Sequence, residues 1–260
     1  MALTDSDLER IHAAGWNFPA ELWATLSDYE KSFAVLEFDG IKTPSYYQER
    51  LATLEFARRG RVLDAACGMG QWANALAELG NEVVGVDLME SRIDVAKALS
   101  AAQGNTCLFQ TGSIEKLPFP DCSFDGVFCY GAFMFTAMPL TIREFARVLK
   151  PGGRLYLNGN TWGWYAHLIF DRGIKGRNYS LIRAVLRMIA RTLVGRSSQI
   201  VITEGWLRKR LHEAGFSVLA LGAEGTVSMG AAQTNLPPPA YPPTFYGIRS
   251  IIELVAERST

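Results

Sequence analysis

The stretch RVLDAACGMGQWA, residues 61–73, decides how the rest of the chain is interpreted. Strand-forming residues lead into Asp64, and Gly68 and Gly70 follow in a turn where missing Cβ atoms let a ligand approach the backbone closely. Small and apolar residues then recur at helical spacing over 71–79. Strand, glycine turn and helix together predict the first half of a nucleotide-binding βαβ unit.

Composition restricts the class of protein. The chain has 260 residues, 48% of them hydrophobic, which is enough for a full core. Its formal net charge of zero gives no global field that would attract nucleic acid. The four cysteines lack the spacing of a disulfide framework or a zinc site. We find no apolar run of the ~18 residues that a membrane span needs, and the acidic N-terminus is unlike a signal peptide, so we expect a cytoplasmic protein.

Strand and helix patterns alternate between residues 61 and 158, which predicts a parallel sheet covered by helices on both faces. Beyond the first strand, we expect strands at 82–87, 106–110, 124–130, 154–158, 216–221 and 248–255. The last two are expected to be an antiparallel pair. We also expect a helix at 46–59, ahead of the first strand, and another at 180–194. The sequence suggests a single domain with four parts: an N-terminal helical cap (1–45), a core (46–160), a helical insertion (161–200), and a C-terminal helix and strand pair (201–260).

A glycine turn after a strand does not by itself identify the cofactor, because NAD-, FAD- and S-adenosylmethionine-binding proteins all use one. The pattern Gly68-x-Gly70-x-x-Ala73 even fits the dinucleotide fingerprint. Asp64 would repel a pyrophosphate, whereas it could accept hydrogen bonds from an ammonium group. Asp87 ends the next strand, where its carboxylate can accept both hydroxyls of an adenosine ribose. These two acids favour S-adenosylmethionine (SAM).

Four segments extend this interpretation: VLDAACGMG (62–70), VVGVDLMESRI (83–93), GSIEKLPFPDCSFDGVF (112–128) and RVLKPGGRLYL (147–157). In order and spacing they resemble the motifs of the class I, Rossmann-like SAM-dependent methyltransferases, particularly the small-molecule group related to ubiquinone and menaquinone biosynthesis methyltransferases. The resemblance is strong over 46–160 and weak elsewhere. It implies an α/β fold with a seven-stranded, mostly parallel sheet whose last strand pair is antiparallel.

The resemblance also implies a cofactor site, whose residues would be Tyr46, Arg50, Asp64, Ala66, Cys67, Gly68, Gly70, Asp87, Leu88, Gly112, Ser113, Ile114, Cys129 and Tyr130. In this site Asp87 would hold the ribose and Leu88 would lie against the adenine. Ser113 and Ile114 would lie at the adenine edge. Ser113 replaces an acid that is common at its position, so its hydroxyl would accept the adenine hydrogen bond more weakly.

Other implied positions surround the methionine end of the cofactor. Ala66 replaces a common glycine and adds one methyl group there. Cys129 and Tyr130 would face the sulfonium and the substrate, and Tyr46 and Arg50 resemble residues of a lid. Asp64 and the glycine turn would cradle the methionine group.

The catalytic residues are predicted on chemical grounds. Tyr130 could orient the acceptor, and His167, which follows the fifth strand, could take a proton from an attacking hydroxyl or amine. A positively charged sulfonium is a good leaving group, so geometry and a dry pocket matter more than acid or base catalysis. An apolar or aromatic acceptor is suggested by aromatic residues at Phe133, Phe135, Trp162, Trp164, Tyr165, Phe170, Tyr241, Phe245 and Tyr246.

The sequence therefore predicts a methyltransferase that acts on a small organic acceptor, such as a natural product or a quinone-like ring, and releases S-adenosylhomocysteine (SAH). The alternatives are a SAM-binding protein without catalysis, working as a sensor or partner subunit, and an RNA or protein methyltransferase. No motif of the Asn-Pro-Pro-Tyr type follows the fourth strand, which argues against base methylation. We expect no nucleic-acid partner, no stable membrane insertion, and a monomer or dimer. The stripe Arg183, Arg187 and Arg191 is interpreted as a solvated helix face; the alternatives are that it binds an anionic substrate, a carrier-protein phosphopantetheine region or a membrane surface.

Overall fold

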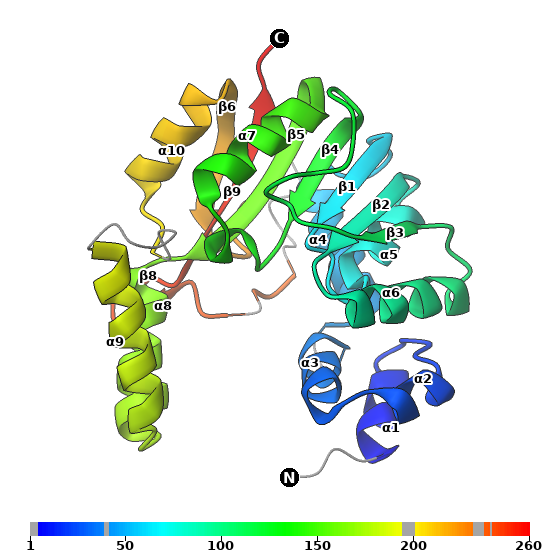
Figure 1. Cartoon of the computed structure of the whole chain (residues 1–260), viewed down its shortest axis with the longest axis horizontal. Coiled ribbons are helices and arrows are strands. Elements are labelled where there is room, and N and C mark those ends of the chain that lie inside the picture. Colours follow the sequence, from blue (N-terminus) through cyan, green and yellow to red (C-terminus); the bar gives the residue numbers. More distant parts are fainter. Residues whose placement is uncertain (1–4, 39–41, 194–200, 231–236, 240) are drawn as a thin grey trace.

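A computed structural model describes residues 5–38, 42–193, 201–230, 237–239 and 241–260. Its centre is a seven-stranded sheet with the strand order β3-β2-β1-β4-β5-β9-β6 (Figure 1). The strands are β1 (Arg61–Ala65), β2 (Glu82–Asp87), β3 (Leu108–Thr111), β4 (Phe124–Cys129), β5 (Leu149–Asn160), β6 (Phe216–Ala223) and β9 (Ile251–Arg258). Strand β9 runs antiparallel to both β5 and β6, and the other pairings are parallel. The predicted seven-stranded, mostly parallel sheet is confirmed.

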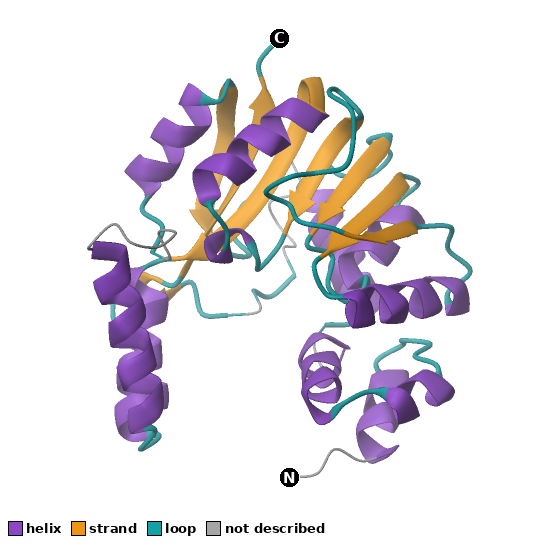
Figure 2. Cartoon of the chain, viewed as in Figure 1, coloured by secondary structure: helices purple, strands orange, loops and turns teal. Residues whose placement is uncertain are grey.

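Side chains of each strand alternate between two hydrophobic cores. Val62 and Tyr156 belong to one core, and their neighbours Leu63 and Leu157 belong to the other. The first core includes residues of α4 (Pro44–Thr53), α5 (Gln71–Glu78) and α6 (Glu90–Ala102). The second includes residues of α7 (Met138–Val148) and α10 (Glu204–Glu213). Helices therefore cover both faces of the sheet, as the strand and helix alternation predicts (Figure 2).

The helix before β1 is shorter than its apolar pattern indicates. That pattern continues to Arg59, whereas α4 ends at Thr53. Glu55 and Arg58 have φ angles of 57° and 50°, which a right-handed helix cannot include. Between them Phe56 is fully buried, and its ring packs edge-to-face against Phe128 of β4 at 5.5 Å. Burial of this ring against the sheet thus overrides the helical pattern.

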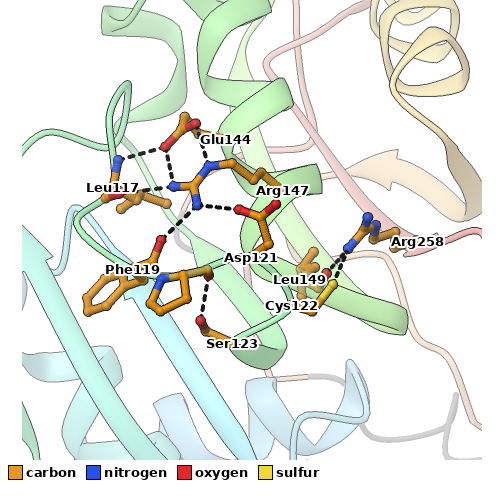
Figure 3. A network of polar contacts seen from close by, with 10 residues as sticks. Leu117, Phe119, Asp121, Cys122, Ser123, Glu144, Arg147, Leu149 and Arg258 are labelled. Carbon is orange, nitrogen blue, oxygen red and sulfur yellow. Dashed lines mark hydrogen bonds and ion pairs between the residues drawn. The ribbon is translucent and has the colours of Figure 1, made fainter.

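Residues 112–123 connect β3 to β4 as an extended loop held by Arg147 of α7 (Figure 3). The guanidinium donates to the carbonyl oxygens of Phe119 (2.7 Å) and Leu117 (3.0 Å), and it contacts the carboxylates of Asp121 (2.9 Å) and Glu144 (2.8 Å). Glu144 in turn accepts a hydrogen bond from the backbone N–H of Leu117 at 2.8 Å. One side chain therefore joins the third and fourth sequence motifs.

Helices before and after the core lie beyond the carboxyl ends of the parallel strands (Figure 1). The N-terminal group is α1 (Asp5–Ala13), α2 (Ala20–Thr25) and α3 (Asp28–Phe38). After β5 comes a helical hairpin, residues 162–193: α8 (Trp162–His167) continues into the π-helix η2 (Leu168–Lys175), and α9 (Tyr179–Leu193) packs back against η2. The predicted helix at 180–194 corresponds to α9, and residue 194 lies outside the described residues.

Smaller elements complete the architecture. A 3-10 turn, η1 (Phe133–Phe135), precedes α7, and the short ribbon of β7 (Thr244–Phe245) and β8 (Ile248–Arg249) comes just before β9. The expected strand at 248–255 is therefore divided between β8 and β9. Among the described helices, none combines the length and the apolar character that crossing a membrane requires.

Candidate active site

Two adjoining cavities open where the parallel strands end. The first, of about 300 Å³, is lined by Phe33, Glu37, Lys42, Ala66, Cys67, Gly68, Gln71, Trp72, Asp87, Arg92, Tyr130, Gly131, Ala132, Met134, Phe135, Asn158, Asn160, Trp164, Tyr241 and Ile251. The second, of about 250 Å³, is lined by Ala66, Asp87, Leu88, Met89, Arg92, Gly112, Ser113, Ile114, Glu115, Ala132, Phe135 and Thr136. Both lie at the crevice where doubly wound α/β folds bind ligands, and five residues line both.

Asp87, the last residue of β2, lies at the junction of these cavities. Its Oδ2 accepts a hydrogen bond from the backbone N–H of Gly68 at 3.0 Å, and its Oδ1 accepts one from Met89 at 2.9 Å. These bonds fix the carboxylate to the glycine turn and to the start of α6. Each oxygen keeps lone-pair capacity for a further donor, and the residue lines both cavities. A ribose with two adjacent hydroxyls matches this acceptor.

Asp64 lies at the end of β1, beneath the turn and not among the residues that line the cavities. Its side chain is almost completely buried, and Oδ2 has no hydrogen-bond partner. Burial, reinforced by the charge of Asp87, raises the pKa of Asp64 to about 8. The unpartnered oxygen of this buried carboxyl lacks a donor, and because the side chain lines neither cavity, the structure does not place it against the expected ammonium group.

The turn itself has a constrained backbone. Gly70 has a φ of 85°, and a Cβ there would lie 3.0 Å from the Cβ of Ala96, so only glycine fits. Gly68 also has a positive φ, 55°. Ala66 has a φ of 64°, an uncommon conformation for a residue with a Cβ, and it lines both cavities. Alanine in place of the glycine that is common at this position thus puts a methyl group in the cavity wall, on a residue with a strained backbone conformation.

The residues predicted around the adenine come together in the second cavity. Leu88 is 71% exposed despite its apolar side chain, and it lines this cavity together with Gly112, Ser113 and Ile114. The hydroxyl of Ser113 accepts a hydrogen bond from the backbone N–H of Glu115 at 3.2 Å. An apolar wall beside backbone groups and one hydroxyl suits a flat heteroaromatic ring.

The end of β4 carries Cys129 and Tyr130. Cys129 is fully buried and does not line either cavity, and burial raises its pKa well above the usual range. Burial likewise raises the pKa of Cys67, which lines the first cavity. Tyr130 lines that cavity too, and its hydroxyl donates to Oε1 of Glu224 at 3.1 Å. Glu224 is buried, its Oε2 has no partner, and burial raises its pKa.

Two predicted cofactor residues lie away from the cavity walls. Arg50 is buried and donates to Glu253 of β9 at 2.6 Å and to the carbonyl oxygen of Val227 at 2.7 Å. Tyr46 is buried beside it on α4, with its ring 5.4 Å from that of Tyr47. Arg50 and Tyr46 therefore contact other parts of the protein and do not line either cavity.

His167 also lies outside the cavity lining. Its Nδ1 is 2.9 Å from Oδ2 of Asp171, one turn further along the hairpin, and its ring stacks on Phe245 at 4.1 Å. Trp164, one turn before it, does line the first cavity and packs against Tyr241 at 5.0 Å. The start of the hairpin therefore faces the cavity through Trp164, and His167 faces the β7–β8 ribbon.

Several lining residues were missed by the sequence analysis. Phe33, Glu37 and Lys42 come from the N-terminal segment, where only helical periodicity was visible. Glu37 accepts hydrogen bonds from Lys42 (3.2 Å) and from Gln71 of α5 (3.1 Å), so it links the cap to the glycine turn. The guanidinium of Arg92 lies 4.3 Å from the centre of the Phe33 ring. Neither Glu37 nor Lys42 belongs to a motif, so the sequence contained no signal for them.

The sheet order and the cavities at the ends of the parallel strands define a Rossmann-like α/β architecture. Residues 63–157 match the family model described as a methyltransferase domain. The chain is 39% identical over 109 residues to the "Uncharacterized methyltransferase YcgJ" of Bacillus subtilis, which is 41% of this chain and 43% of that protein. It is 40% identical over 100 residues to the demethylmenaquinone methyltransferase of Deinococcus radiodurans, 37% of this chain and 42% of that protein. The chain thus matches less than half the length of these relatives.

A solved structure supports the same fold over a greater length. The crystal structure of YcgJ superposes with a TM-score of 0.55 at 21% identity, covering 82% of this chain and 99% of that one. The match of residues 63–157 to the methyltransferase-domain model, together with these relatives, confirms the resemblance predicted from the four motifs. The domain match and the names of these relatives support a methyltransferase as the type of enzyme.

Proposed function

We propose that the protein transfers the methyl group of SAM to a small, apolar or aromatic organic acceptor. The observation that carries the proposal is the pair of adjoining cavities with different walls. Asp87, Leu88 and Ser113 suit an adenosine in the second cavity. Aromatic side chains line the first, among them Trp72, Tyr130, Trp164 and Tyr241. The name of one relative, demethylmenaquinone methyltransferase, supports a quinone-like ring as the acceptor.

When bound, SAM supplies an electrophilic methyl group on a positively charged sulfur. The protein's part is to hold the acceptor in line with that methyl group and to keep water out. The ring of Trp72 packs against the ring of Tyr130, with 4.9 Å between their centres, and this contact fixes the tyrosine ring in the cavity wall. Ala66, Ala132 and Phe135 line both cavities and so lie where cofactor and acceptor would meet.

An acceptor that reacts through O–H or N–H must also lose a proton. Of the two predicted catalytic residues, Tyr130 lines the cavity, whereas His167 is held by Asp171 and Phe245 outside its lining. The proposal therefore gives Tyr130 the acceptor-orienting role. Glu224 lies behind Tyr130 and accepts a hydrogen bond from its hydroxyl. Burial raises the pKa of Glu224, which makes its carboxylate a better proton acceptor than that of an exposed glutamate.

The test begins with the cofactor. Titration calorimetry should show binding of SAM and SAH and no binding of NAD, and the opposite pattern would overturn the proposal. Release of SAH is then measured with a panel of quinols, phenols and other small aromatic acceptors. Binding of SAM without turnover of any acceptor would favour the alternative of a SAM-binding protein without catalysis.

A substitution at Asp87 tests the ribose contact. Asp87→Ala should weaken SAH binding by ~1–3 kcal/mol, because two hydroxyls lose a charged acceptor. Asp94→Ala is a matched control, since it removes the same charge from an exposed position on α6. Equal affinity of the Asp87→Ala variant and the unmodified protein would refute the assigned role.

A further inference from the structure

The helical hairpin ends in a tip that projects from the body of the molecule. The tip comprises residues 170–179, from the second half of η2 through the turn to the start of α9. Figure 1 shows this end of α9 at the lower left, remote from the sheet. The hairpin is held at its other end, where Tyr165 and Val185 are buried in a small hydrophobic cluster of their own.

Large apolar side chains are exposed at the tip. Phe170, Ile174 and Tyr179 are 48%, 51% and 63% exposed, and Leu186 follows on the outer face of α9 at 52%. The opposite face of α9 packs inward through Val185 and its neighbours, so these exposed residues are not needed for the hairpin's own core. Exposed apolar residues gathered on one projection indicate a surface that contacts something less polar than water.

The same region carries an excess of positive charge. Residues 168–190 contain five exposed cationic side chains: Arg172, Lys175, Arg177, Arg183 and Arg187. Its one acid, Asp171, is already bonded to Lys175 at 2.6 Å and to His167 at 2.9 Å. The side chain of Arg191, the third member of the arginine stripe, lies outside the described residues. The projection therefore offers a net positive field without competing free carboxylates.

The tip is also fixed to the body of the protein. Tyr246, next to the β7–β8 ribbon, donates to Oδ1 of Asp171 at 2.7 Å, and its ring meets Phe170 edge-on at 5.5 Å between centres. Gly173 permits close packing, because a Cβ there would lie 2.4 Å from Cγ1 of Ile182 on α9. The exposed side chains are thus held on a preformed scaffold.

We propose that the hairpin tip docks on the surface of an anionic lipid bilayer. A convex projection that interleaves aliphatic and aromatic side chains with cations suits an interface where apolar groups enter the headgroup region and cations contact lipid phosphates. A nucleic acid or a strongly acidic protein surface would contact the cations but offers little apolar surface to Ile174 and Phe170. This contact is peripheral, at the level of the lipid headgroups.

The hairpin connects the docking tip to the first cavity, because Trp164 at its base lines that cavity. The docking proposal does not rest on methyl transfer, which is tested separately by SAH binding.

The experiment is sedimentation of the full chain with lipid vesicles. We expect binding to vesicles that mix phosphatidylglycerol with phosphatidylcholine, and much weaker binding to phosphatidylcholine alone. Arg177→Gln and Arg183→Gln should each lower the vesicle partition coefficient about fivefold, the effect of one surface charge near an anionic membrane. Ile174→Ser should lower it as well, at unchanged charge.

The matched control is Lys209→Gln on α10, which removes an exposed charge from another part of the surface and should leave partition unchanged. Circular dichroism and SAH titration verify that the variants are folded. Loss of binding in the arginine variants with no effect of Ile174→Ser would overturn the proposal and favour an acidic macromolecule as partner. Equal binding to neutral and anionic vesicles, or no binding to either, would overturn it too. Failure to bind SAH with normal vesicle binding would instead refute the proposed methyl transfer alone.

Discussion

At the scale of single residues, Asp64 has a property that the sequence did not reveal. Its position at the end of the first strand was predictable, because an acid after an apolar run and before a glycine turn is a distinctive pattern. Its protonation was not, since the raised pKa follows from complete burial close to Asp87. The sequence shows which residues neighbour Asp64 along the chain. The desolvation of its carboxyl depends on how distant segments pack around it.

The raised pKa of Asp64 predicts a pH dependence of stability. The carboxyl titrates near 3.8 when unfolded and at about 8 when folded. Folding therefore favours its protonated form, and this stabilisation is complete below about pH 4 and is lost as pH rises through about 8. The free energy of unfolding of the unmodified protein, relative to Asp64→Asn, should fall by ~1.4 kcal/mol per pH unit inside this window and level off above it.

Denaturant unfolding at a series of pH values measures that difference. Asparagine keeps the size and polarity of the side chain but does not titrate, so other groups cancel in the comparison. Parallel stability curves for the two proteins between pH 4 and 8 would contradict the assignment of a raised pKa to Asp64.

At the scale of elements, the sequence located the strands and helices of the core well and the surrounding elements less well. The core strands are short runs of apolar residues, because side chains on both faces of the sheet are buried, and such runs are easy to find in the sequence. The end of α4 was misjudged because Phe56 is buried against Phe128 from another strand. In the π-helix η2, Gly173 packs closely against Ile182 of α9, a contact that no local pattern encodes.

The loop between β3 and β4 provides a test at this scale. Arg147 is its main anchor, so Arg147→Gln should lower the free energy of unfolding by ~1–3 kcal/mol through the loss of charged hydrogen bonds. The loop also begins with Gly112, Ser113 and Ile114 of the second cavity, so SAH binding should weaken as well. Thermal unfolding and calorimetry measure the two effects.

Arg143→Gln is the appropriate control for that variant. Arg143 lies on the same helix, carries the same charge and is exposed, so its loss should change both quantities little. If the two variants behaved alike, the loop would not depend on the guanidinium of Arg147.

At the scale of the whole molecule, a buried ion pair joins distant parts of the chain. Arg50 on α4 and Glu253 on β9 are separated by more than two hundred residues, and their side chains are 2% and 0% exposed. Tyr156 and the backbone N–H of Val227 also donate to Glu253. The resemblance suggested a lid role for Arg50, but only the tertiary structure shows Glu253 as its partner.

Removing one partner of this pair should be costly. Arg50→Met leaves the charge of Glu253 buried without its cation and should lower the free energy of unfolding by ~3–5 kcal/mol. Lys97→Met, which breaks an exposed pair with Asp94, should cost no more than ~1 kcal/mol. The double variant Arg50→Met, Glu253→Leu should recover much of the loss, and denaturant titration of all three variants measures this.

The wall shared by the two cavities has a thermodynamic consequence. Ala66, Ala132 and Phe135 line both cavities. A ligand bound in one cavity would therefore form part of the surface that a ligand in the other cavity contacts. Any free energy of coupling between the two ligands is reciprocal: the factor by which SAH tightens an acceptor is the factor by which that acceptor tightens SAH. An unknown acceptor can therefore be recognised indirectly, as the compound whose presence changes the dissociation constant of SAH, before any reaction has been observed.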